Sequence, residues 1–155
     1  MKKILVLFLV TTVAISCKKK ESKNDTLQES KEVVVETPTT LLQVGCYEYS
    51  KDGNQISLEI IEIDNTIKGN ITYALAEKDS NTGTFIGELN EDKLIGTYTF
   101  SSEGTESTRE VAFMVKDNQL IEGFGELNET GNAFKDKTNI SYTSTMPLTK
   151  IDCTK

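Results

Sequence analysis

The 155-residue sequence contains no histidine and no tryptophan, and Arg109 is its single arginine. Histidine is the usual general base near neutral pH, a common metal ligand and a member of the familiar serine and cysteine triads. Its absence excludes these triads and the imidazole ligands of most zinc sites. No pair of carboxylates stands out as a glycosidase pair would. We therefore predict no catalytic residues, no metal and no cofactor, and a function other than that of an enzyme.

Positive charge is also scarce. The chain has 17 lysine and arginine residues against 24 aspartate and glutamate residues, which gives a net charge of −7 at pH 7. A nucleic-acid-binding protein needs a basic face to neutralise phosphates. The composition therefore predicts that nucleic acid is not a partner.

The sequence has only two prolines, and most of it shows the two-residue alternation of half-buried strands. In the stretch from Gly83 to Leu127, for example, Leu94, Tyr98 and Phe100 fall on one face. Asp52-Gly53 is typical of a type I′ hairpin turn. A longer loop is expected over residues 101–108. We predict eight strands, at residues 44–50, 55–63, 66–75, 84–89, 94–101, 109–116, 120–127 and 140–145.

Short antiparallel strands joined by tight turns are typical of all-β folds. The hairpin connections favour a single antiparallel meander that closes into an eight-stranded, lipocalin-like up-and-down barrel, with a β-sandwich as the alternative. The interior of such a barrel is filled by side chains or holds one small ligand.

The N-terminus has the pattern of a secretory signal. Lys2 and Lys3 precede an apolar run that is too short for a permanent membrane span. Cys17 follows Ser16, and this arrangement resembles a bacterial lipoprotein signal, which implies a lipidated cysteine at the mature N-terminus; the alternative is an ordinary signal cut near Ser16. We thus expect a signal peptide at residues 1–16, a disordered tether at 17–40 and a β-barrel domain at 41–155. The alternative within the tether is a short added edge strand at Val33-Val34-Val35.

Two cysteines remain besides Cys17. Cys46 lies in the first predicted strand and Cys153 near the C-terminus. In a closed meander the first and last strands are neighbours, and compartments outside the inner membrane favour disulfides. We predict a disulfide between Cys46 and Cys153, with two unpaired buried thiols as the alternative.

Arg109 is the one candidate for a binding residue. Its position in the alternation places it on the same face as Val111 and Phe113, and so at one mouth of the barrel. A guanidinium there can bind a ligand carboxylate through two hydrogen bonds. The competing interpretation is a structural ion pair with Glu103 or Glu106.

Several features together resemble small envelope lipoproteins of bacteria. They are the signal ending at Cys17, the lysine-rich tether, Cys46-Tyr47-Glu48-Tyr49, and the run from Ser102 to Val111. A weaker similarity, to the membrane-bound lysozyme inhibitors, rests on Cys46, Asp52-Gly53 and Cys153. These resemblances imply a protein lipid-anchored in the cell envelope, with the outer membrane facing the periplasm as the expected location.

Three functions follow as expectations. The first is a non-catalytic interaction or structural module with an envelope protein as its partner. The second is a barrel that binds a small hydrophobic or carboxylate-bearing ligand. The third is an inhibitor of lysozyme.

Overall fold

The computed structural model describes residues 42–102 and 104–153. The predicted signal peptide, Cys17, the tether and Glu103 lie outside the described residues. Within the described part, no helix is long and apolar enough to cross a membrane.

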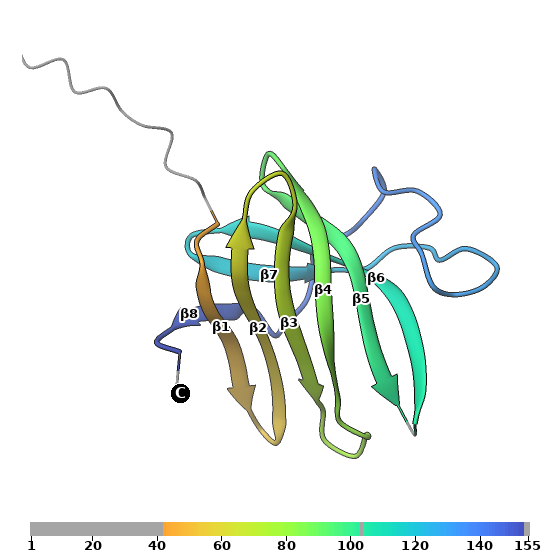
Figure 1. Ribbon diagram of the computed structural model, residues 1–155, viewed down its shortest axis with the longest axis horizontal. Helices are drawn as coiled ribbons and strands as arrows, with labels where there is room; N and C mark the ends of the chain where they lie inside the picture. Colours follow the sequence, from red (N-terminus) through yellow and green to blue (C-terminus); the bar gives the residue numbers. More distant parts are fainter. Residues whose placement is uncertain (1–41, 103, 154–155) are drawn as a thin grey trace, which may run out of the picture. The chain divides into compact units, whose positions relative to one another are not determined.

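The chain folds into eight antiparallel strands in meander order, and the last strand pairs with the first to close a barrel (Figure 1). This confirms the predicted barrel rather than the sandwich. The strands are β1 (Gly45–Lys51), β2 (Asn54–Ile63), β3 (Ile67–Ala74), β4 (Asn81–Asn90), β5 (Lys93–Ser102), β6 (Thr105–Lys116), β7 (Gln119–Gly123) and β8 (Leu148–Ile151).

The barrel forms because one face of each long strand is apolar. In β3, for example, Ile67, Gly69, Ile71 and Tyr73 are buried, while the residues that alternate with them are more exposed. These inward side chains build one core, which includes Tyr47, Ile56, Leu58, Ile60, Phe85, Leu94, Tyr98, Val111, Phe113, Val115, Leu120 and Leu148. Side chains therefore fill the barrel interior, as expected for eight strands.

Tight turns connect the strands where the sequence predicts them. Asp52 and Gly53 have φ values of 54° and 77°, and Asp117 and Asn118 have values of 50° and 60°. Positive φ at both central residues is the requirement of a type I′ turn, whose twist matches that of the flanking strands. The predicted hairpin at Asp52-Gly53 is thus confirmed.

Three local predictions are wrong. The strand expected at 120–127 ends at Gly123, where β7 leaves the barrel. The expected loop at 101–108 is mostly strand, because β5 continues to Ser102 and β6 begins at Thr105, with Gly104 at a φ of 78° between them. The segment expected to form a strand at 140–145 makes only the isolated bridge between Phe124 and Ser141. The strand that closes the barrel is instead β8.

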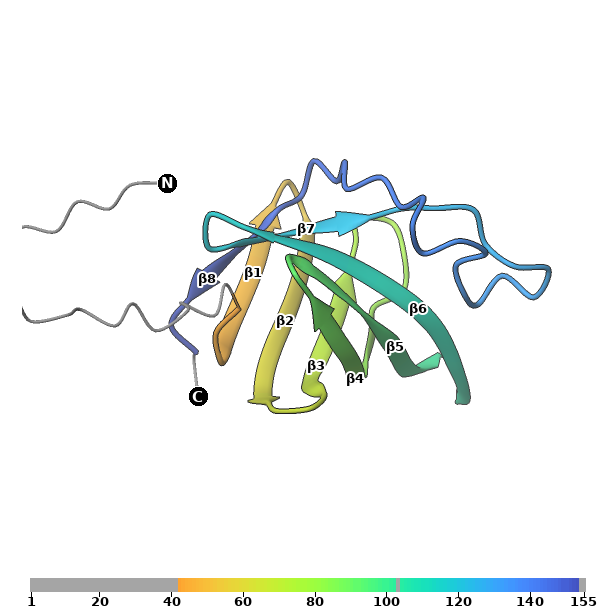
Figure 2. The ribbon, with the colours of Figure 1, turned by 90° about the horizontal axis from the view of Figure 1, so that it is seen from above.

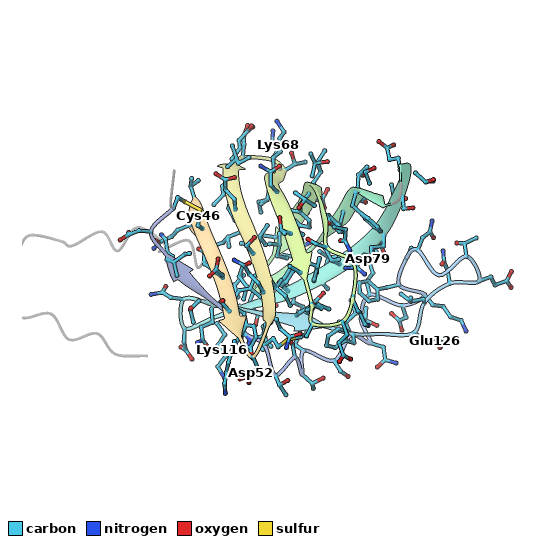
Figure 3. All side chains as sticks on the ribbon, turned by 90° about the horizontal axis from the view of Figure 1, so that it is seen from below. Cys46, Asp52, Lys68, Asp79, Lys116 and Glu126 are labelled. Carbon is cyan, nitrogen blue, oxygen red and sulfur yellow. A yellow bond between two sulfur atoms is a disulfide. The ribbon has the colours of Figure 1, made fainter. Side chains whose placement is uncertain are left out.

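The disulfide at the seam follows from this closure. Cys46 in β1 pairs in register with Ile151 of β8, and the Cys46 and Cys153 sulfur atoms are 2.10 Å apart (Figure 3). The structure therefore brings together the two cysteines that the sequence predicted as partners. Elsewhere the seam is thin: β8 forms three residue pairs with β1 and two with β7.

The barrel wall is incomplete beside β6. This strand has 12 residues, whereas β7 has five and pairs only with the part of β6 from Ala112 onward. Beyond Gly123 the chain leaves the barrel in an irregular excursion, residues 124–147, before it returns as β8 (Figure 2). The first half of β6 therefore has β5 on one side and no strand of the described chain on the other.

Candidate functional site

Arg109 lies on the inner face of β6, as the sequence alternation predicted, and is surrounded by aromatic rings. Its guanidinium carbon is 4.7 Å from the ring centre of Tyr73, 5.6 Å from that of Tyr98 and 5.7 Å from that of Phe100. Tyr98 is its cross-strand neighbour on β5. Such placement stabilises the cation through the negative faces of the rings. We call Arg109 and these three residues the arginine box.

Two hydroxyl groups of the arginine box are fixed by hydrogen bonds. The Tyr73 hydroxyl donates to Oε1 of Glu122 over 2.7 Å, and the Tyr98 hydroxyl donates to Oδ1 of Asn81 over 2.8 Å. The Tyr98 and Phe100 rings stack with centres 4.8 Å apart. Hydrogen bonds thus connect the arginine box, whose residues lie on β3, β5 and β6, to Asn81 of β4 and Glu122 of β7.

Glu122 is a buried carboxyl group on β7, with 9% of its surface exposed. Burial raises its pKa, because it penalises the charged form, while the hydrogen bond from Tyr73 and the charge of Arg109 act in the opposite direction. Burial also raises the pKa of Tyr73 well above its ordinary value, with the Glu122 charge adding to the effect. The pKa of Tyr98 rises to about 12, again through burial. Both tyrosines therefore remain hydrogen-bond donors over the physiological range.

The structure separates Glu106 from Arg109. Glu106 is exposed and lies on the opposite face of β6 from Arg109, since strand residues alternate in direction and the two are three positions apart. Glu103 lies outside the described residues. Tyr73 and Glu122 were not among the predicted site residues, because they come from strands distant in sequence from Arg109. The sequence alternation could show that both residues point inward. Only the strand register of the folded barrel shows that they lie near Arg109.

A pocket of about 170 Å³ opens in the wall where β7 departs from β6. Its lining includes Arg109, Val111, Glu122, Phe124, Leu127 and Phe134. Phe124 and Leu127, which are 53% and 45% exposed, both lie in this lining. The Nε atom of Arg109 is buried and has no hydrogen-bond partner among the described residues. We call this cavity the wall pocket.

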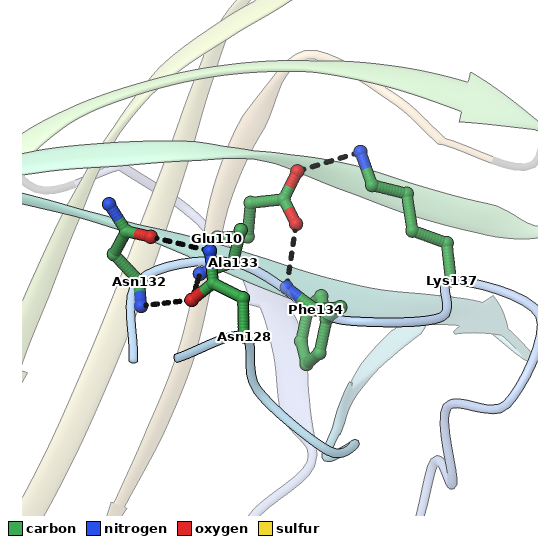
Figure 4. A network of polar contacts seen from close by, with 6 residues as sticks. All are labelled: Glu110, Asn128, Asn132, Ala133, Phe134 and Lys137. Atoms are coloured by element: carbon green, nitrogen blue, oxygen red, sulfur yellow. Dashed lines mark hydrogen bonds and ion pairs between the residues drawn. The ribbon is translucent and has the colours of Figure 1, made fainter. Parts of the chain in front are cut away.

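Glu110 attaches the excursion to the barrel. Its backbone N–H donates to the carbonyl of Asn132 over 2.8 Å. Its carboxylate accepts the Phe134 N–H over 2.9 Å and pairs with Lys137 over 2.7 Å (Figure 4). Asn128 braces the same loop by accepting the N–H groups of Asn132 and Ala133. The excursion therefore covers the edge of β6 at Glu110 and ends the wall pocket there.

The rest of that edge is open. In a strand, successive residues direct their N–H and C=O groups to opposite sides. Val115 donates its N–H toward β5, to Asp92, whereas Glu110 donates to the excursion on the other side. By this alternation the N–H and C=O groups of Glu106 and Thr108 point away from β5, and neither residue forms a hydrogen bond there with any described residue. We call residues 105–109 the free edge.

A larger hollow, about 390 Å³, lies on the outer face of the barrel. Its lining includes Ile86, Ile95 and Thr97, which point away from the core residues Phe85 and Leu94. Its one carboxylate–amine pair, Glu110 with Lys137, is already satisfied. Glu88 and Asn90 also line this hollow, and both are exposed to solvent, as expected of an open depression on the outer surface.

Comparison with known proteins gave no match to a protein family, to a curated protein or to a solved structure. The resemblances to envelope lipoproteins and to lysozyme inhibitors remain predictions from the sequence.

Proposed function

We propose that this protein is a non-catalytic, lipid-anchored interaction module of the bacterial cell envelope, which binds an extended segment of a partner protein by adding it as a strand to the free edge. The observation that carries the proposal is the open row of backbone groups at Glu106 and Thr108. An exposed strand edge is a ready template for pairing with another chain. Strand addition is also an established mode of peptide recognition.

The size of the wall pocket, the cavity that Arg109 lines, favours a protein partner over a small ligand bound at Arg109. Sites for small molecules usually enclose about 300–1,000 Å³. The wall pocket measures about 170 Å³, and the core side chains occupy the barrel interior. A space of this size suits one side chain of a bound segment better than a whole lipocalin-type ligand.

Charge argues for a foreign partner rather than a second copy of the chain. The free edge displays the exposed carboxylate of Glu106, and the whole chain carries a net charge of −7. Two copies joined edge to edge would bring like charges together, which opposes association. A segment with basic residues would instead be attracted.

The anchor completes the proposal. Lipid chains on Cys17 would hold the protein on the membrane, since each buried CH₂ group contributes roughly 0.8 kcal/mol and two or more chains are needed for stable attachment. The tether at 17–40 would let the barrel reach its partner from the outer membrane. Incorporation of labelled fatty acid into the wild-type chain, and its loss in Cys17→Ser, is the expected result; labelling that persists in Cys17→Ser would refute the anchor.

The interaction is tested by photocrosslinking in the cells that produce the full-length protein. A photoreactive residue replaces Glu106 at the free edge, or Glu59 on β2 as a control. Glu59 is exposed, but β2 is paired there with β1 on one side and with β3 on the other, so no strand edge is open. We expect a specific adduct from position 106 and none from position 59.

The same experiment is repeated in Thr108→Pro, which removes one N–H of the free edge and no ladder hydrogen bond. Proline is tolerated at edge positions whose N–H faces outward. The matched control is Thr108→Val, which retains the N–H. Loss of the adduct in Thr108→Pro but not in Thr108→Val supports strand addition. An adduct that survives Thr108→Pro, or that forms equally at position 59, contradicts it.

A further inference from the structure

We infer that the wall pocket receives an apolar side chain of the bound segment, and that the segment carries a basic residue three positions away, which pairs with Glu106. This inference rests on the proposed function and specifies the chemistry of the partner.

The position of the wall pocket connects it to the free edge. Arg109 belongs to both the wall pocket and the free edge. The last residue pair between β6 and β7 is Ala112 with Gly123, and the pocket begins beyond this pair, where the two strands separate. A strand added along residues 105–109 would run toward this gap and meet the excursion at Glu110. Its residue beside Arg109, on the inner face, would then point into the pocket, since side chains opposite each other in a sheet share a face.

The lining of the pocket selects an apolar side chain. Phe124 and Leu127 are largely exposed at its mouth, and Val111 and Phe134 complete its apolar part. Covering such side chains is favourable because it removes apolar surface from water. An acidic side chain would instead enter beside the Glu122 carboxyl group, while the Arg109 charge is already stabilised by three rings.

The outer face selects a basic residue. Glu110 is engaged by Lys137 and the Phe134 N–H, whereas Glu106 is exposed and forms no ion pair with a described residue. Opposite charges on neighbouring strands stabilise a sheet. Glu106 and Arg109 are three positions apart and face opposite sides. A segment that satisfies both would therefore carry a basic and an apolar residue with the same separation.

The test is a selection from a phage-displayed library of random decapeptides on the full-length, lipidated protein held in detergent micelles. We expect enrichment of peptides with lysine or arginine three positions from a large apolar residue. The affinity of a selected peptide is then measured for variants of the protein. Phe124→Ala/Leu127→Ala should weaken binding by about tenfold, as expected when a central apolar contact is lost.

Two control variants separate the inference from the proposed function. Ile61→Ala removes an equally exposed apolar side chain, 53% accessible, on β2, away from the pocket, and should leave affinity unchanged. If Thr108→Pro abolishes binding while Phe124→Ala/Leu127→Ala does not, the pocket assignment is overturned and the proposed function stands. If the selected peptides carry an acidic residue at the pocket position, Arg109 is an anion receptor and the assignment is also overturned. Selected peptides that bind Thr108→Pro as tightly as wild type would overturn the proposed function itself.

Discussion

Replacing Cys46 and Cys153 with serine removes the covalent closure of the barrel seam. The seam depends on β8, a strand of four residues in which only Leu148 is buried. Three residue pairs join β8 to β1 and two join it to β7. With so little pairing and burial, the disulfide is the main restraint that keeps the C-terminal strand in register.

The expected loss follows from the length of the closed loop. The two cysteines are 107 positions apart in sequence. In the chain-entropy description, a cross-link that closes about 100 residues stabilises the folded state by about 4.7 kcal/mol, and measured values are typically about 2–4 kcal/mol. We therefore expect the double variant to lose roughly 4 kcal/mol. This is a large share of the roughly 5–15 kcal/mol that stabilises a typical domain.

Urea unfolding followed by circular dichroism measures this loss, since the chain has no tryptophan to report by fluorescence. The double variant Cys46→Ser/Cys153→Ser is preferable to either single one, because a single variant leaves one unpaired thiol that can form a disulfide with a second copy of the chain. The variant should unfold at a lower urea concentration and with a steeper dependence on urea, because its unfolded chain is less compact. A loss below about 1 kcal/mol would refute the reasoning, since it would mean that closing the long loop contributes far less than chain entropy requires.

Two further predictions concern the interior of the barrel. The raised pKa of Glu122 means that folding favours the protonated form of this carboxyl group. Its contribution to the free energy of unfolding is therefore fully present below the unfolded pKa of about 4.3 and is lost as the pH rises through the folded pKa. Unfolding measured from pH 4 upward should show wild type losing stability relative to Glu122→Gln, and a constant difference would contradict the assignment. In Gly96→Ala, the new Cβ would lie 2.5 Å from Gly87 Cα and 2.7 Å from the Phe85 ring, so we expect a loss of about 1–3 kcal/mol from overpacking. Thr97→Ala on the outer face is the control, and equal stability of the two variants in thermal unfolding would refute the packing argument.

The successes and failures of the sequence predictions have physical causes. Strands with an apolar inner face, such as β3 with Ile71 and Tyr73, were predictable because burial enforces the alternation. The residues of β5 and β6 near Gly104 extend beyond the apolar core, so their polar, largely exposed sequence resembled a loop.

The prediction of the closing strand at 140–145 was wrong for a different reason. Ile140 and Tyr142 alternate as strand residues do, but they pack over Gly123, where a Cβ would lie 2.6 Å from each side chain. The actual β8 buries only Leu148 and so carries little alternation.

The site could be predicted only in part. The inward direction of Arg109 followed from its alternation with Val111 and Phe113. Its contact with Tyr73 depends on how far the barrel curves, and the free edge depends on where β7 ends. Both are properties of tertiary structure that the local sequence does not encode.

The most direct test of the free edge is amide hydrogen exchange, measured by NMR on the full chain without a partner. We expect an alternating pattern in β6: the amides of Ser107 and Arg109, which point to β5, exchange slowly, while those of Glu106 and Thr108 exchange rapidly. Slow exchange at Glu106 and Thr108 would contradict the assignment of a free edge, because it would mean that the edge is already covered by another part of the chain or by a second copy.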